Sequence, residues 1–349
     1  MRFIGVIFHG ILRLGIIEFF VVFFILINIS TFFLYVIDKQ KAVKGKWRIR
    51  ERTLIFFTLT CGGIGAFFGM WLAKHKTSNK KFRIAVLVGL AVALVPALHI
   101  AHSFTLDRVI RFKEIEFHSE NWPAELDGYR IAFMTDMHVI TDADMGGVIA
   151  ELNERDIDLL LLGGDFTMRD AHYKGTLREI AQAVTTDGIF GVEGNHDDYR
   201  RLFSAKEQLG IIPLDNSGIL IREGFYLAGV QDMWNRSPNI QAAISGAYSS
   251  DFVLLVSHNP DVSMMQSTNS IDLILSGHTH GGQITFFGFP MYLLRGSITD
   301  YGIRFGYGFS YSADQVPVFV SSGIGVYYSI PRIFARPEVV IFTMYSSKQ

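Results

Sequence analysis

The feature that most constrains the fold is a set of five short apolar runs, each followed by residue types that bind metal ions. Residues 131–134 precede Asp136 and His138, 159–162 precede Gly164 and Asp165, 189–192 precede Gly194 to Asp197, 252–256 precede His258, and 271–275 precede His278 and His280. Buried strands that deliver such residues at their carboxyl ends are typical of an α/β sheet that builds a site along one edge. The sequence therefore predicts a site assembled from residues far apart in the chain.

Between and beyond these runs the pattern predicts more helices and strands. Residues 143–154, 177–184 and 200–209 are expected to be helical, so strand and helix alternate as in a parallel-rich sheet. After residue 211 the apolar runs shorten and helical patterns become rare. Runs at 225–230, 317–321 and 339–344 predict further strands, which we expect to form a second sheet packed on the first.

The first third of the chain differs from the rest in charge and hydropathy. Residues 1–106 hold 14 Lys and Arg against 3 Asp and Glu, whereas residues 107–349 hold 18 against 30. Apolar runs occupy 14–37, 53–73 and 84–104, and the first exceeds the roughly 20 residues that cross a bilayer. That run is too long for a signal-peptide core, and no small-residue cleavage site follows it. We expect a membrane part joined to a soluble part. Basic residues that flank apolar runs do not indicate nucleic-acid binding.

Two basic segments, 39–52 and 74–83, leave two membrane topologies open, because each of them favours the cytoplasmic side. If the glycine-rich run 53–73 enters the bilayer and returns, both segments stay inside and the soluble part faces outward. If that run spans the bilayer, the soluble part faces the cytoplasm. We favour the outward, extracytoplasmic arrangement. The single cysteine, Cys61, excludes an intrachain disulfide.

The expected domains follow from these patterns. Residues 1–106 would be a multi-pass membrane domain with two or three transmembrane or re-entrant helices, and residues 125–349 the catalytic domain. Residues 107–124 would be a linker with an edge strand, because 109–117 alternates apolar and charged side chains. The exit from the membrane is the alternative interpretation of that alternation.

Seven residues at the ends of the five runs supply three oxygen and four imidazole donors, namely Asp136, His138, Asp165, Asn195, His258, His278 and His280. They are too many for one tetrahedral zinc site, and they suit two divalent ions if one carboxylate is shared. Oxygen and nitrogen donors without thiolate fit Mn, Fe or Zn better than Ca, and of these we expect Mn. Two ions about 3.5–4 Å apart can clamp a phosphoryl group during in-line attack.

The order and spacing of these residues resemble the calcineurin-like metallophosphoesterases over about 125–345. The matching motifs are Asp136-x-His138, Gly164-Asp165, Gly194-Asn195-His196-Asp197, His258 and Gly277-His278-Thr279-His280. The resemblance implies a four-layer α-β-β-α fold with two mixed sheets. It implies one ion on Asp136, His138, Asp165 and His280, and a second on Asp165, Asn195, His258 and His278, with Asp165 as the bridge. It also implies that His196 donates a proton to the leaving group or steadies the transition state, oriented by Asp197.

Further details are similar to the membrane-associated bacterial branch of this family, whose members act on phosphodiesters and some on lipid-linked pyrophosphates such as UDP-diacylglucosamine. Among the matching stretches are Asp127 to Ile131, Gly229-Val230-x-Asp232, Gly281-Gly282-Gln283 and Arg336-Pro337-Glu338. The branch commonly has Ser-Arg-Gly where this chain has Ser321-Ser322-Gly323. If that arginine binds phosphate, Arg295, Arg332 or Arg336 would replace it here, or the substrate differs.

The N-terminal part, over about 30–100, resembles a family of bacterial membrane domains of unknown function. The matching stretches include Asp38-Lys39, Trp47-Arg48-Ile49, Gly62-Gly63, Gly65-Ala66 and His75-Lys76-Thr77. This resemblance implies an all-α transmembrane region and no known chemistry.

The expected function is a membrane-tethered, dinuclear-metal-dependent phosphoesterase. It would hydrolyse a phosphodiester or pyrophosphate bond of a lipid-linked or envelope substrate by attack of a metal-bridging hydroxide. The alternatives are a broad-specificity phosphatase for soluble nucleotides or phosphoproteins and a non-catalytic membrane sensor or scaffold. Membrane lipid is an expected partner, and no obligate protein partner is expected. The aromatic run 286–294 would be either core or an apolar lip that touches lipid.

Overall fold

The structure is a computed structural model of the chain. It describes residues 16–105, 109–138, 145–166, 170–198, 200, 204, 208–286, 289–290, 298–326 and 332–348. The chain divides into two compact units, Met1–Thr105 and Leu106–Gln349. Each unit is described by itself below.

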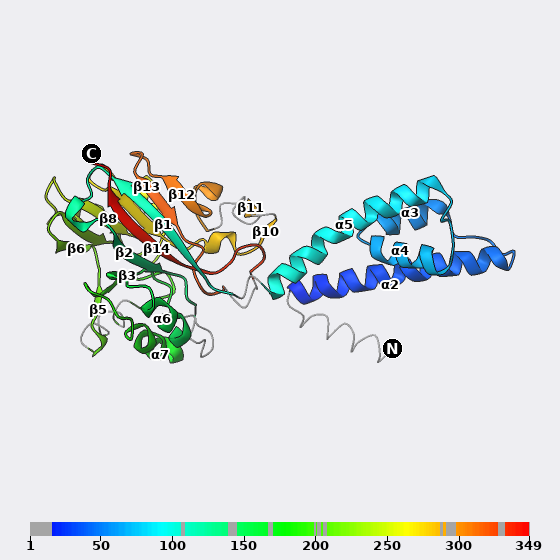
Figure 1. Cartoon of the computed structure of the whole chain (residues 1–349), viewed down its shortest axis with the longest axis horizontal. Helices are drawn as coiled ribbons and strands as arrows, with labels where there is room; N and C mark the ends of the chain where they lie inside the picture. The colour runs from blue at the N-terminus through cyan, green and yellow to red at the C-terminus, as the bar shows by residue number, and fades with distance from the viewer. Residues whose placement is uncertain are drawn as a thin grey trace. The chain divides into compact units, whose positions relative to one another are not determined.

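The first unit is helical where it is described (Figure 1). Its helices are α2 (Ile16–Val43), α3 (Glu51–Leu59), α4 (Gly63–Leu72) and α5 (Lys80–Phe104). Among the described residues, two stretches are long and apolar enough to cross a bilayer, Val21–Val43 in α2 and Lys80–Leu98 in α5. Helices α3 and α4, with 9 and 10 residues, are each too short to do so.

Helices α3 and α4 form a hairpin whose two open ends meet. Lys76, which follows α4, forms an ion pair of 2.7 Å with Glu51 at the start of α3. At the closed end, the Asn28 side chain of α2 donates to the Cys61 carbonyl (3.0 Å) and accepts from the backbone N–H of Gly65 (2.9 Å). Because Asn28 lies within the apolar stretch of α2, the tip of the hairpin lies partway along that stretch.

Glycines let the hairpin approach its neighbours closely. A Cβ on Gly63 would lie 2.0 Å from the carbonyl carbon of Gly89 in α5, and a Cβ on Gly65 would lie 1.9 Å from the carbonyl oxygen of Asn28. Any side chain at these two positions would collide with backbone. The glycines therefore serve helix packing, as small residues do in membrane helix bundles.

The second unit contains two six-stranded sheets. The first has the order β1 (Arg111–Ser119), β14 (Glu338–Ser346), β2 (Tyr129–Met134), β3 (Leu159–Leu162), β4 (Ile189–Gly191), β5 (Ile211–Pro213). The second has the order β12 (Gly308–Tyr311), β13 (Pro317–Val320), β9 (Leu273–Ser276), β8 (Phe252–Val256), β7 (Phe225–Gly229), β6 (Ser217–Arg222). Both are mixed, since β14 is antiparallel to β2 and the edge strands β6 and β12 are antiparallel to their neighbours.

The sheets pack face to face with helices outside them. One buried cluster joins Phe133 and Leu161 of the first sheet to Leu254 and Leu275 of the second. Other clusters cover the outer faces, with α6 (Met145–Asn153) and α7 (Asp170–Ile180) on the first sheet and α9 (Ile240–Ala243) and α10 (Val262–Met265) on the second. The remaining elements are η2 (Ala124–Leu126), η3 (His280–Gly282), η5 (Gly302–Phe305) and the hairpin β10 (Thr285–Phe286) with β11 (Phe289–Pro290). The predicted four-layer arrangement of two mixed sheets is confirmed.

The placement of individual strands differs from the expectation in two respects. The five strands expected to share one edge are divided, with β2, β3 and β4 in the first sheet and β8 and β9 in the second. The run 339–344, expected in the second sheet, belongs to β14, which pairs with β1 and β2 in the first. Strand β1, which covers most of the run 109–117, is an edge strand. The helix expected at 200–209 falls largely outside the described residues.

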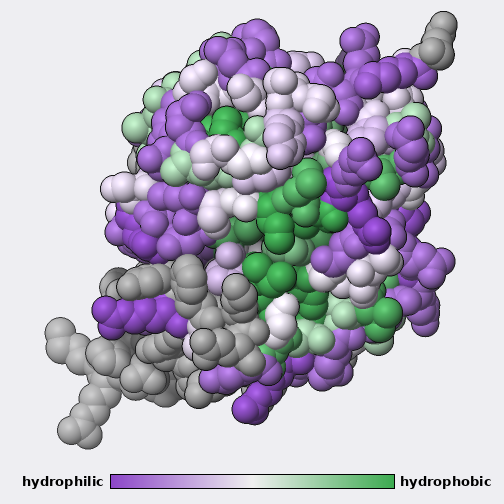
Figure 2. All heavy atoms as spheres, turned by 90° about the vertical axis from the view of Figure 1, so that its left-hand side faces the viewer, coloured by the Kyte–Doolittle hydropathy of each residue, from purple (hydrophilic) through white to green (hydrophobic). Residues whose placement is uncertain are grey.

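One face of the second unit carries exposed apolar side chains among polar ones (Figure 2). Strand β6 lies on the side of Figure 1 that faces the viewer in Figure 2. Its Ile219 and Leu220 are 42% and 46% exposed. Both side chains belong to an edge strand and are not part of the buried cluster between the two sheets.

Candidate metal centre

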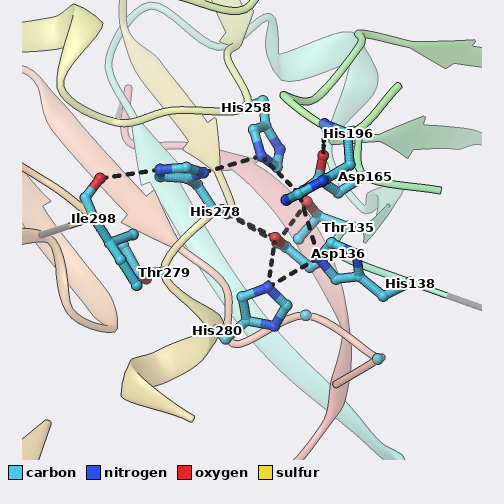
Figure 3. A network of polar contacts seen from close by, with 12 residues as sticks. Thr135, Asp136, His138, Asp165, His196, His258, His278, Thr279, His280 and Ile298 are labelled. Carbon is cyan, nitrogen blue, oxygen red and sulfur yellow. Dashed lines mark hydrogen bonds and ion pairs between the residues drawn. The ribbon is translucent and has the colours of Figure 1, made fainter. Parts of the chain in front are cut away.

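The carboxyl ends of β2, β3, β4, β8 and β9 bring the seven expected ligands together. Figure 3 labels six of them, all except Asn195. Asp136, Asp165 and His258 are buried at the centre of this network, with at most 2% of their surface exposed. The strands are central members of their sheets, which explains why short loops after them can lie side by side although the residues are up to 144 positions apart in the chain.

The first group of donors consists of Asp136, His138 and His280, whose ligand atoms all lie within 4.8 Å of one another. Nε2 of His138 lies 3.0 Å from Nε2 of His280. Nε2 of His280 lies 3.4 Å from Oδ1 of Asp136. A carboxylate and two imidazoles at these distances fit the donor set of a single divalent ion.

The second group consists of Asn195, His258 and His278. Nε2 of His258 lies 3.1 Å from Oδ1 of Asn195 and 3.2 Å from Nδ1 of His278. Nδ1 of His258 contacts the Gly163 carbonyl (2.8 Å), and Nε2 of His278 contacts the Ile298 carbonyl (3.0 Å). A carbonyl oxygen only accepts, so these two ring nitrogens donate. In neutral imidazoles the two nitrogens that face each other would then carry lone pairs. A cation between them would satisfy both, and carbonyls that accept from the other ring nitrogen orient metal-binding histidines.

One carboxylate oxygen lies between the two groups. Oδ2 of Asp165 is 3.3 Å from Nε2 of His138 and 3.3 Å from Nε2 of His258. Asp136 also approaches both groups, because its ligand atom lies within 4.8 Å of those of Asp165 and His258. The residues present therefore fit two neighbouring ions, and Asp165 as the bridge stays a prediction.

The buried carboxylates of the site favour the binding of cations. Burial opposes protonation of His258, yet the carboxylates of Asp165, Asp136 and Asp232 raise its pKa well above the usual range. Burial would raise the pKa of Asp165, but His258 and His138 hold it well below the usual range. Burial, with the charge of His258, lowers the pKa of His278 to about 3, so this imidazole is neutral and able to bind a metal at neutral pH. Divalent ions would supply the positive charge that the buried carboxylates otherwise draw from His258.

The backbone turns sharply at most of these ligands. Asp136, His138, Asp165, His278 and His280 have φ values of 50°, 41°, 55°, 70° and 52°. Left-handed conformations are uncommon outside glycine, and they concentrate at functional sites where neighbouring structure holds them. Here the loops hold one another, because the Asp136 N–H donates to the Gly164 carbonyl (2.9 Å) and the His138 N–H to the Asp165 carbonyl (3.0 Å).

Comparison with known families matches the second unit to the family that its sequence motifs resemble. Residues 129–282 match the family described as calcineurin-like phosphoesterase. A protein of Helicobacter pylori named "Uncharacterized metallophosphoesterase" is 31% identical over 245 residues, which are 66% of this chain and 63% of that protein. The chain carries a calcineurin-like metallophosphoesterase domain. The chain spans less than two thirds of the Helicobacter protein's length.

Other similar proteins carry informative names. A "Transmembrane protein with metallophosphoesterase domain" of Danio rerio is 24% identical over 315 residues, covering 82% of this chain and 69% of that protein. A "Phosphodiesterase YaeI" of Escherichia coli is 27% identical over 242 residues, covering 62% of this chain and 82% of that protein. Residues 28–82 match a family described as "Protein of unknown function (DUF1294)". The metallophosphoesterase domain and these names support a phosphoric ester hydrolase that depends on metal, as expected from the sequence.

His196 and Asp197 lie at the edge of the metallophosphoesterase centre. The His196 N–H donates to Oδ1 of Asp165 (2.9 Å), and its half-buried ring lies 5.4 Å from the ring of His138. Asp197 accepts three backbone N–H bonds, from Asp165 (2.6 Å), Gly194 (2.8 Å) and Phe166 (3.0 Å). The Asp197 carboxylate thus braces two ligand-bearing loops, and its expected role in orienting His196 stays a prediction.

Of the three arginines considered for phosphate binding, Arg332 uses its guanidinium for hydrogen bonds to backbone carbonyls. It is 1% exposed, and it donates to the carbonyls of Gly325 (2.8 Å), His280 (3.2 Å), Ala335 (3.2 Å) and Ser322 (2.7 Å). These bonds join the His280 loop to the loop after β13. Arg336 donates to the Val109 carbonyl at 3.5 Å, and Arg295 lies outside the described residues. The structure therefore argues against Arg332 as a substitute phosphate ligand.

Arg332→Met is expected to lower thermal stability and metal content together. Four carbonyls would lose a donor, three of them in buried hydrogen bonds, and each unsatisfied buried group costs about 1–3 kcal/mol. Differential scanning fluorimetry and metal analysis measure both effects, with Arg336→Met, which removes one long hydrogen bond, as the matched control. A raised KM for a phosphate ester at unchanged stability would instead assign Arg332 to the substrate.

Sequence reasoning missed the turn after β7. Asn235 donates from Nδ2 to the Asn195 carbonyl (2.6 Å), and the Trp234 ring lies 4.6 Å from the ring of His278. Asp232 was noted only as part of a matching stretch. Trp is not a metal ligand, and Asn235 lies outside the five ligand motifs, so the ligand pattern contained no signal for this turn.

Proposed function

We propose that the chain is a membrane-tethered hydrolase that uses two divalent ions, manganese in the first place, to cleave a phosphodiester or pyrophosphate bond. The observation that carries this proposal is the position of Oδ2 of Asp165, 3.3 Å from a histidine of each donor group. A carboxylate shared in this way suits a pair of ions, and paired ions are typical of phosphoryl-transfer sites.

The residues divide the work as follows. Asp136, His138, Asp165 and His280 would hold one ion, and Asp165, Asn195, His258 and His278 the other. When bound, the ions would withdraw charge from the phosphoryl oxygens and make water sufficiently acidic to attack phosphorus. His196, beside the first group, would give a proton to the departing alkoxide, although burial lowers the pKa of its imidazole.

An ester panel tests the reaction. Purified full-length protein with Mn²⁺ is expected to hydrolyse soluble aryl phosphodiesters and a lipid-linked pyrophosphate, to lose activity with a chelator and to regain it with added metal. A strong preference for soluble monoesters such as nucleotides would favour the broad-specificity phosphatase. No turnover of any ester would favour a non-catalytic sensor or scaffold.

We further propose that the N-terminal unit is a multi-pass membrane domain with α3 and α4 as a re-entrant hairpin. The apolar stretches of α2 and α5, and the transmembrane name of the Danio rerio relative, support membrane association. The Glu51–Lys76 ion pair at the open end supports placing both basic segments on one side of the bilayer, the cytoplasmic side. Helix α2 then starts on the other side of the bilayer, and helix α5 ends there. The catalytic domain, which follows α5, is extracytoplasmic. Domain limits of 1–106, 107–124 and 125–349 are consistent with this proposal.

Labelling of single cysteines in intact cells tests the topology. In a Cys61→Ser background, Ser249→Cys on the exposed surface of the catalytic unit is expected to react with a membrane-impermeant maleimide. Ser78→Cys, which is exposed between α4 and α5, is expected to react only after the cells are permeabilised. The reverse pattern would place the catalytic domain in the cytoplasm.

A lipid-linked or envelope substrate is proposed because the chain combines membrane helices with a phosphoesterase domain. In the aromatic run 286–294, Phe289 is 67% exposed, which supports an apolar lip. The Phe286 side chain, residues 287–288 and residues 291–294 lie outside the description. The ester panel above includes the lipid substrate that this part of the proposal requires.

A further inference from the structure

The turn of residues 232–236 after β7 is held rigidly. Oδ1 of Asp232, a residue only 1% exposed, accepts from the backbone N–H groups of Trp234 (2.9 Å) and Asn235 (3.1 Å). The Arg236 N–H donates to the Asp232 carbonyl (3.0 Å), which closes the turn. The Arg236 guanidinium forms ion pairs with Asp215 (2.9 Å) and Glu193 (3.4 Å). The backbone that carries Trp234 therefore has a fixed position.

The same turn is fastened to the metal centre on the side of the second donor group. Asn235 donates to the carbonyl of Asn195, the expected ligand, at 2.6 Å. The Trp234 ring meets the ring of His278 edge to face, with centroids 4.6 Å apart and an interplanar angle of 88°. Trp234 thus lies directly against an expected metal ligand.

Trp234 nevertheless remains 52% exposed, whereas His258 and His278 are 0% and 5% exposed. A tryptophan that served only to cover His278 would be expected to bury most of its large apolar surface. Half of that surface faces solvent beside the place where the phosphoryl group would bind. An exposed, rigidly held aromatic ring next to a reaction centre is the type of group that contacts a ligand.

A second segment with exposed apolar side chains, 298–306, is hydrogen-bonded to His278. The Ile298 carbonyl accepts from Nε2 of His278 (3.0 Å), as the dashed line in Figure 3 marks. Three and five residues further along, Tyr301 and Ile303 are 37% and 47% exposed. The Thr279 hydroxyl donates to the Gly306 carbonyl (2.9 Å), so this segment stays close to the ligand loop. Exposed apolar side chains thus occur on the Trp234 turn, which contacts the His278 ring, and on the segment 298–306, whose backbone is bonded to the same ligand loop.

We propose that Trp234 determines substrate specificity by contacting an apolar or planar group esterified to the phosphate on the His278 side. This proposal rests on the proposed phosphoesterase function and specifies its substrate class, a diester whose retained alcohol carries an alkyl or acyl chain or an aromatic ring close to phosphorus. Both kinds of group bury apolar surface against an indole ring, whereas a methyl or glycerol ester would gain little.

Esters with one constant leaving group test the proposal. The p-nitrophenyl diesters of methyl, phenyl and decyl alcohol release the same p-nitrophenolate, so only the retained group differs. Trp234→Ala is expected to lower kcat/KM for the phenyl or decyl diester about 10-fold or more, mainly through KM, and to change the methyl diester less than about 3-fold. Trp234→Phe is expected to restore most of the loss. Tyr248→Ala, which removes an aromatic ring that is 71% exposed elsewhere in the unit, is the matched control.

The outcomes separate the possible roles. Loss on phenyl alone identifies an aromatic group, and loss on decyl alone identifies an alkyl chain. Equal loss on all three esters, or loss of bound metal, would overturn the proposal and leave Trp234 as a residue that positions His278. If the wild-type protein turned over none of the esters, the proposed function would fail. Calorimetric binding of phenylphosphonate and methylphosphonate still tests Trp234 in that case, because equal affinities would contradict the apolar contact.

Discussion

Asp165→Asn is expected to remove bound metal and turnover together. The substitution keeps the size of the side chain but removes the negative charge between His138 and His258, whose Nε2 atoms each lie 3.3 Å from Oδ2. Loss of a shared ligand should lower metal affinity or activity by more than the about 10–100-fold caused by loss of a group that only hydrogen-bonds to a ligand. Elemental analysis of the purified variant measures the metal, and the ester assay measures turnover.

Asp272→Asn is the matched control, because Asp272 directly precedes β9 and lies at the end of that strand opposite the ligands. It should retain full metal content. If Asp165→Asn also retained full metal, the bridging assignment would be wrong. Asp136, which approaches both donor groups, would then be the carboxylate to test.

His196→Ala is expected to keep the metal and to lose about 10²–10⁴-fold in kcat, the usual contribution of a positioned proton donor. The described contact of His196 with Asp165 uses its backbone N–H, so removal of the imidazole leaves that bond in place. The loss should be large for an alkyl leaving group, which needs a proton. It should be small for p-nitrophenolate, which departs as the anion.

Comparison of the two leaving groups, with metal analysis of the same sample, decides the role of His196. Equal losses would assign it to stabilisation of the transition-state charge instead of proton donation. Loss of metal would make it a ligand. Each of these results would change the division of work among the residues proposed above.

The ligand positions could be predicted from the sequence because each depends on a local pattern. A short apolar run that ends in Asp or His marks a buried strand and the loop at its carboxyl end, and the structure places Asp136, Asp165 and His278 after such strands. The fold class followed from the same runs and from the resemblance.

The partners of each strand could not be predicted in this way. Strand β14 reads as an apolar run like the others, yet it lies between β1 and β2 because both of its edges find backbone partners there. The division of the five strands between two sheets likewise depends on pairing and packing between distant segments. The hydrogen bonds of Arg332 to four backbone carbonyls also depend on contacts between distant segments.

The N-terminal unit shows the same limit. The run 53–73 is long enough for one transmembrane helix by its length and composition. In the structure it is divided into α3 and α4 by a turn at Cys61, where φ is 64°. Asn28, more than 30 residues earlier in the chain, bonds both sides of that turn. A contact with another helix therefore stabilises the break, and the run itself contains only its glycines as a sign of it.

The brace formed by Asp197 has a consequence for how ions would enter the proposed centre. Its carboxylate binds the backbone of the Asp165 loop and of the Gly194 loop, so an ion that fixes one loop also orders the other. We therefore expect cooperative loading, in which the second ion binds more tightly than the first. In a calorimetric titration of metal-free protein, Asp197→Ala should convert one steep transition into two separate binding steps. Two well-separated steps in the unaltered protein would exclude this coupling.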